Sequence, residues 1–74
     1  MEKDEKQFLK NLGERIIEIR KQKNLMQIEL SSNLNMEDSS LRRIEKGRTN
    51  TTILMLKKIC KELNISLSYL LDFK

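Results

Sequence analysis

A chain of 74 residues, 38% of them hydrophobic, has room for one small domain with one core and leaves no length for a second. Its single cysteine, in a chain without histidine, excludes an internal disulfide and a metal centre of histidine and cysteine ligands. The formal charge of +4 suits an anionic partner such as nucleic acid, although many helical domains with other partners are equally basic.

Targeting segments and catalytic motifs are both missing from the sequence. The first seven residues are polar, and no apolar run approaches the roughly 18 residues that a membrane span requires. There is no glycine-rich phosphate loop and no nucleophile beside a base, and Cys60 falls on the apolar stripe of a helical pattern. We therefore expect a cytoplasmic protein that is not an enzyme, with no membrane contact, no cofactor and no metal.

The absence of proline and of strand-like alternation leaves helical periodicity as the pattern to follow. A first helix is predicted from Asp4, a candidate N-cap with Gln7 three residues on, to about Lys23. Its apolar stripe consists of Leu9, Leu12, Ile16 and Ile19. Gly13 lies inside this helix at a cost of about 1 kcal/mol relative to alanine, so the helix either frays or bends there or packs closely against another helix.

Two short amphipathic helices are predicted next, at about residues 27–34 and 38–46, with a polar break between them. Their inward residues are Leu30 and Leu34 in the first and Leu41 and Ile44 in the second. The narrow stripe of the second is typical of a surface helix with a task other than packing. Gly47 is placed to end it in the left-handed conformation.

Two further helices complete the chain. The fourth, about 52–63, is capped by Thr51 or Thr52 and ended by Asn64, and the fifth runs from the N-cap Ser66 to about Asp72. The residues expected to face the core are Ile53, Leu56, Ile59, Cys60 and Leu63 in the fourth helix and Leu67, Leu70 and Leu71 in the fifth. The sequence thus predicts an all-α fold.

Three stretches, LGERIIEIRKQKNLMQIEL, NLNMEDSSLRRIEKGRTN and LKKICKELNISLSYLL, resemble the phage repressor and Cro-type (XRE-like) helix-turn-helix regulators over about residues 12–71. The resemblance implies a compact five-helix, lambda-repressor-like domain over 1–74, with the helix-turn-helix at about 26–46 and its second helix in the major groove. It implies a sequence-specific transcription regulator, a repressor or a restriction-modification controller protein. The alternative is an antitoxin-like or other protein-interaction module on the same fold.

Base-contacting residues follow from the matched positions of the third helix. The resemblance assigns this role to Asp38, Ser39, Arg42 and Arg43. Arginine can bind guanine O6 and N7 through a bidentate fork, so Arg43 is the leading base reader, while Arg42 suits a base or a phosphate. A carboxylate repels phosphate unless it accepts from cytosine N4 or caps the helix, and for Asp38 we favour the cap. The competing interpretation is a solvated charged face.

Phosphate-contacting residues are implied on both sides of that helix. They are Gln27, Lys46, Arg48, Thr49 and Asn50. Gln27 lies in a first helical turn, where its amide can donate to a phosphate, and it is otherwise an exposed polar residue. The basic charge is local, because residues 42–48 hold four basic side chains and one acid, whereas residues 24–41 hold three acids and no base.

The matched positions also imply an ion pair between Arg20 and Glu45, tying the first helix to the end of the third. Burial would make that pair a strong structural link, whereas exposure would leave it weak. Met26, Glu37 and Thr51 depart from the family pattern, which places capping residues and a proline there. Each lost cap costs on the order of 1 kcal/mol, although Met26 has the option of packing against Leu30 or a neighbour.

A lone domain of this size covers little DNA surface, so the sequence predicts a homodimer on a pseudo-palindromic, double-stranded operator. Its half-sites are expected one helical turn apart. The apolar residues left over for an interface are Leu54, Met55, Tyr69 and Phe73. The alternative is that Leu54 and Phe73 complete the core of the monomer.

Overall fold

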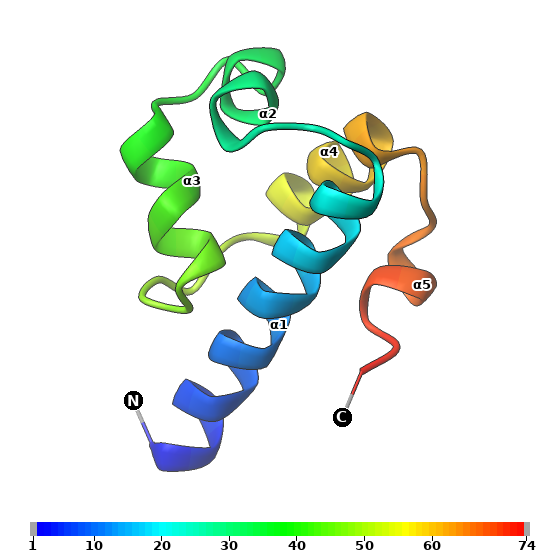
Figure 1. Cartoon of the computed structure of the whole chain (residues 1–74). Coiled ribbons are helices and arrows are strands. Elements are labelled where there is room, and N and C mark those ends of the chain that lie inside the picture. Colours follow the sequence, from blue (N-terminus) through cyan, green and yellow to red (C-terminus); the bar gives the residue numbers. More distant parts are fainter. Residues whose placement is uncertain (1, 74) are drawn as a thin grey trace.

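The computed structural model describes residues 2–73, which form helices and no strand. The elements are α1 (Lys3–Gln22), α2 (Gln27–Asn33), α3 (Asp38–Glu45), α4 (Ile53–Leu63) and α5 (Leu67–Leu70) (Figure 1). The predicted all-α class and its five helices are therefore confirmed.

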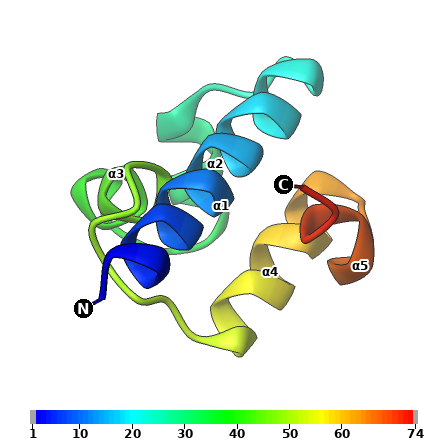
Figure 2. The same ribbon diagram turned by 90° about the horizontal axis from the view of Figure 1, so that it is seen from below.

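The long helix α1 organises the other elements. It packs against α3 on one side and α5 on the other, and the views in Figures 1 and 2 agree that α3 and α5 lie on opposite sides of it. The core that joins them consists of Leu12, Ile16, Ile19, Leu30, Leu41, Ile44, Leu56, Ile59, Cys60, Leu63 and Leu70. Burial of the inner faces of α2 and α3 in this core leaves the outer face of α3 free to meet a partner.

Helix starts follow local capping chemistry, with one correction. Thr52 and Ser66 accept hydrogen bonds from the backbone of the third residue beyond each, at 3.0 and 3.1 Å, so both predicted caps are confirmed. Asp4 as the cap of α1 is wrong. The backbone N–H of Glu2 donates to Glu5 Oε1 at 3.0 Å, so the N-cap is Glu2. Helix α1 therefore starts nearer the N-terminus than predicted, and Asp4 lies inside its first turn.

Helix ends use the left-handed conformation where the sequence predicts it. Gly47 has φ +70° and Asn64 has φ +57°, so both predictions are confirmed. The predicted inward placement of Ile53 and Leu71 is wrong, since both are exposed. Ile53 is the first residue of α4, where the apolar stripe of the helix is only beginning. Helix α5 ends after a single turn at Leu70, so Leu71 lies beyond the helix and outside its apolar stripe.

Gly13 is a point of close contact between α1 and α3. A Cβ built on Gly13 would overlap the backbone carbonyl of Glu45, and α1 continues through this position as one helix. Close packing against another helix, one of the two predicted reasons for the glycine, is therefore confirmed. The missing side chain lets the end of α3 sit directly on α1, which fixes the position of the exposed face.

Candidate nucleic-acid interface

Helices α2 and α3 form a helix-turn-helix unit. The turn between them contains Asn35 in the left-handed region at φ +55°, and the backbone N–H of Met36 donates back to the Ser31 carbonyl at 3.0 Å. Leu30 of α2 and Leu41 of α3 are fully buried in the shared core. These contacts set the angle at which α3 projects from the protein.

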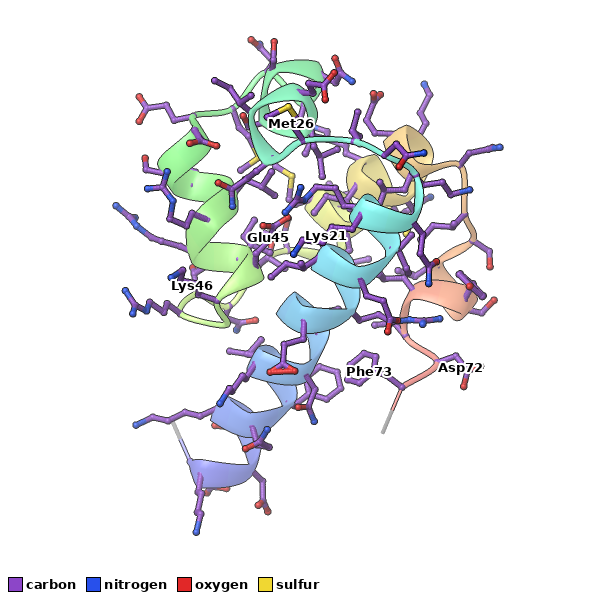
Figure 3. All side chains as sticks on the ribbon, in the orientation of Figure 1. Lys21, Met26, Glu45, Lys46, Asp72 and Phe73 are labelled. Carbon is purple, nitrogen blue, oxygen red and sulfur yellow. The ribbon has the colours of Figure 1, made fainter. Side chains whose placement is uncertain are left out.

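The two faces of α3 differ sharply in character. Leu41, Ile44 and Glu45 are buried, whereas Ser39, Arg42 and Arg43 are exposed. In Figure 3 the Glu45 side chain turns from α3 toward α1. A helix with this division has a fixed inner side and an accessible outer side.

The outer face of α3 carries a shallow hollow of about 220 Å³, which we call the basic hollow. It is lined by Ser39, Arg42, Arg43, Lys46 and Arg48. Arg43 also lines an adjoining depression together with Thr49 and Asn50. The structure therefore brings seven of the nine predicted DNA-contacting residues onto one continuous surface, with four cations at its centre.

Asp38 and Gln27 are the two predicted contact residues that lie in neither the basic hollow nor its adjoining depression. Asp38 lines a different depression, between the start of α3 and α2, which it shares with Ile28 and Met36. The amide Nε2 of Gln27 donates one hydrogen bond inward, to Glu45 Oε1 at 2.8 Å. Gln27 is half-buried, unlike the exposed polar residue that the sequence offered as the alternative to a phosphate contact.

Asp38 does not cap α3. The N-cap is Glu37, whose extended backbone (φ −71°, ψ 145°) precedes the helix, and Asp38 is the first residue inside it. The Asp38 carboxylate is instead paired one turn on with Arg42, at 2.8 Å between Oδ2 and Nη2. Glu37 and Asp38 are adjacent acids, and the backbone conformation makes Glu37 the N-cap.

The departures at helix starts have unequal consequences. The side chains of Met26 and Glu37 make no capping hydrogen bond. At α2 the loss is offset in part, because Glu29 Oε1 accepts from the Met26 backbone N–H at 2.8 Å. The expected packing of Met26 against Leu30 or a neighbour is wrong, since the Met26 side chain is exposed beside α2 (Figure 3).

Arg20 and Glu45 form a buried ion pair behind the outer face. Arg20 Nε donates to Glu45 Oε2 at 2.9 Å, and the two residues are 8% and 2% exposed. A second guanidinium nitrogen of Arg20 donates to the Leu25 carbonyl at 2.9 Å. With Gln27, this network joins the end of α1, the loop after it, the start of α2 and the end of α3.

The participation of Gln27 in that network is what sequence reasoning missed. The two partners, Gln27 and Glu45, are 18 residues apart and follow no local pattern. The same holds for Arg15, whose guanidinium lies 4.6 Å from the centre of the Tyr69 ring and donates to the Tyr69 carbonyl at 2.8 Å. This second link fastens α5 to the side of α1 opposite α3.

The four residues proposed for an interface have different environments. Leu54 is 71% exposed on α4 and Tyr69 is exposed on α5, whereas Met55 and Phe73 are half-buried against the core. The Phe73 ring lies 5.4 Å from that of Phe8, beside the first turns of α1 (Figure 3). The alternative stated from the sequence was that both Leu54 and Phe73 complete the core of the monomer. Phe73 does pack against the core, whereas Leu54 does not.

Two other features bear on function. Burial raises the pKa of the Cys60 thiol, which disfavours the thiolate that a nucleophilic role requires. Across residues 2–73, no helix combines the length with the apolar character that crossing a lipid bilayer requires.

A short positioning helix, a tight turn and an exposed basic helix, set on a helical framework, define the helix-turn-helix class of DNA-binding proteins. Residues 16–70 match the model of the helix-turn-helix family HTH_3, and the chain belongs to this family. It is therefore a DNA-binding transcription regulator in class. No curated protein sequence matches it.

Solved structures share this fold. The clp gene regulator ClgR from Corynebacterium glutamicum superimposes with a TM-score of 0.84 at 23% identity, covering 86% of this chain and 82% of that one. The restriction-modification controller protein C.AhdI from Aeromonas hydrophila gives 0.79 at 26%, covering 86% and 96%. SinR, a master regulator for biofilm formation solved in complex with DNA, gives 0.75 at 35%, covering 82% and 98%.

Proposed function

We propose that the chain works as one sequence-specific DNA-binding domain that inserts α3 into the major groove of an operator. The observation that carries this proposal is the basic hollow, where four cations and Ser39 gather on the exposed side of a helix whose other side is buried. A helix fits the width of the major groove, and guanidinium groups there can reach base edges. The likeness to SinR, solved in complex with DNA, adds support.

Each side chain of this surface has a role in the proposal. Within residues 2–73 the Arg43 guanidinium takes part in no ion pair, so all its donors remain for guanine O6 and N7. Ser39 can donate to or accept from a neighbouring base. Backbone phosphates are left to Lys46, Arg48, Thr49, Asn50 and the second amide hydrogen of Gln27.

Replacing Arg43 with alanine should cost about 1–3 kcal/mol of binding free energy on a preferred duplex and far less on random duplex, because the lost contact reads a base. Arg48→Ala removes an equal charge from the same hollow and is the matched control. This variant should weaken binding to both duplexes alike and lower the salt slope by the contribution of about one phosphate contact. Fluorescence anisotropy over a salt series measures both effects.

The same series separates DNA binding from a protein-interaction role. Each phosphate contacted contributes roughly −0.9 to the slope of log affinity against log salt. If both variants weaken preferred and random duplexes to the same extent, the division between base reading and backbone contact is incorrect. A flat salt dependence would favour a protein partner for α3.

We also propose that the operator-bound form is a homodimer, with Leu54 and Tyr69 at its centre and Met55 and Phe73 at the edge. The exposed apolar side chains of α4 and α5 support this proposal. In Figure 1 α5 lies on the side of α1 opposite α3, so a contact between two copies there leaves the basic hollow free for DNA. Met55, at the edge, lines the depression beside the hollow together with Arg43. The likeness to C.AhdI supports a controller-type regulator acting on a pseudo-palindromic operator in the cytoplasm.

Leu54→Glu should convert the dimer to monomer, because dimerisation would then bury a carboxylate in an apolar contact and remove its water. Glu62→Lys, a charge change at another exposed position of α4, is the control and should leave the mass unchanged. Sedimentation equilibrium at micromolar concentration measures both. A wild-type chain that stays monomeric both alone and on DNA would overturn the dimer.

A further inference from the structure

Asp38 is the one acid of α3 whose side chain is not buried, and it stands next to the basic hollow. Its carboxylate pairs with Arg42, which lines that hollow, at 2.8 Å. An acid on a surface built for phosphate weakens binding to any duplex through repulsion. The pair therefore needs an explanation beyond a solvated charge.

The two carboxylate oxygens of Asp38 have unequal surroundings. Oδ2 accepts from Arg42, whereas Oδ1 is shielded from solvent and accepts no hydrogen bond from any residue of 2–73. Arg42 is thus the cation that balances this partly desolvated charge. In water such a pair contributes little, but a duplex laid over α3 would remove solvent and strengthen the attraction between the two charges.

Pairing also fixes where the Arg42 guanidinium lies. Asp38 is the first residue of α3, so the bond draws Arg42 back along the helix toward its N-terminal end. That end carries the residues that meet base edges when such a helix enters the major groove. A single bond to Oδ2 uses one of the five N–H donors of arginine and leaves the others for DNA.

We propose that Asp38 is a positioning residue that determines specificity, holding Arg42 over the bases and keeping it from the phosphates. This inference rests on the proposed DNA-binding function. The carboxylate has two effects in it. It directs Arg42 to a base, and it lowers the affinity of the chain for random DNA.

The test is Asp38→Asn, with Glu37→Gln as the matched control. Glu37 is the adjacent, exposed carboxylate at the same helix end and takes part in no ion pair within the described chain. Asp38→Asn should lower the ratio of preferred to random affinity about tenfold, the size of one lost base contact. It should steepen the salt slope by about one phosphate, because the released Arg42 turns to the backbone.

Glu37→Gln removes the same charge and should tighten binding to both duplexes alike, leaving their ratio unchanged. A third comparison adds Asp38→Asn to the Arg42→Gln variant. The double variant should have the same ratio of preferred to random affinity as Arg42→Gln alone, because Asp38 acts through Arg42. Circular dichroism melts of all the variants check that they remain folded.

Three results would overturn the inference. Equal ratios for Asp38→Asn and Glu37→Gln would make Asp38 a general surface charge. An undiminished effect of Asp38→Asn without Arg42 would make Asp38 a base reader in its own right. If the wild-type chain binds all duplexes equally, the proposed sequence-specific function is itself contradicted. The first two results contradict only the role of Asp38.

Discussion

Replacing Glu45 with alanine should lower the free energy of unfolding by about 3–5 kcal/mol, because it strands a buried charge. Glu45 is 2% exposed and accepts from Arg20 and from Gln27, so its removal leaves the Arg20 guanidinium desolvated without its anion. The loss should appear in urea denaturation as a lower midpoint with an unchanged slope.

Glu18→Ala is the control for this prediction. Glu18 pairs with Arg15 at 3.0 Å on the surface of α1, where solvent screens the pair, and its loss should cost about 1 kcal/mol or less. Similar small losses for Glu18→Ala and Glu45→Ala would show that the buried network does not hold α3 in place.

Gly13→Ala should destabilise the protein by about 1–3 kcal/mol, although alanine is the better helix former. An added Cβ would overlap the backbone carbonyl of Glu45 and lie 2.7 Å from that of Ile44. Backbone atoms at the end of a packed helix cannot rotate aside as a side chain can. The strain should therefore shift α3 away from α1 and weaken DNA binding along with folding.

Glu14→Ala tests the same helix one residue further on, where the side chain is exposed, and should change the unfolding free energy by about 0.5 kcal/mol or less. Thermal melts together with anisotropy on a preferred duplex measure both variants. A stabilised Gly13→Ala protein that binds DNA normally would contradict the close contact of α1 and α3.

The sequence was sufficient to predict the helices because their stripes and caps are local. Spacings of three and four placed Leu12, Ile16 and Ile19 in the core, and Gly47 marked the end of α3. The errors occurred where periodicity carries little information. Ile53 stands at the first position of its helix and Leu71 follows a helix of one turn, so the stripe does not decide their burial.

The candidate site was predictable in its membership and less so in its internal bonding. The cations of the basic hollow are close in sequence and share one helical face, so the spacing brings them together. Contacts across the fold, such as that of Gln27 with Glu45, depend on how α2 and α3 pack. The choice of Glu37 over Asp38 as the cap depended on a one-residue difference in backbone conformation, which two adjacent acids do not reveal.

Selection of bound sequences from random duplexes, followed by affinities at physiological salt, tests most directly whether the outer face of α3 reads DNA. We expect a twofold-symmetric motif bound at least about 10³-fold tighter than a scrambled duplex, with Arg43→Ala relaxing one position in each half-site. A pool without any enriched motif, or a motif indifferent to Arg43 and its neighbours in the basic hollow, would contradict this account.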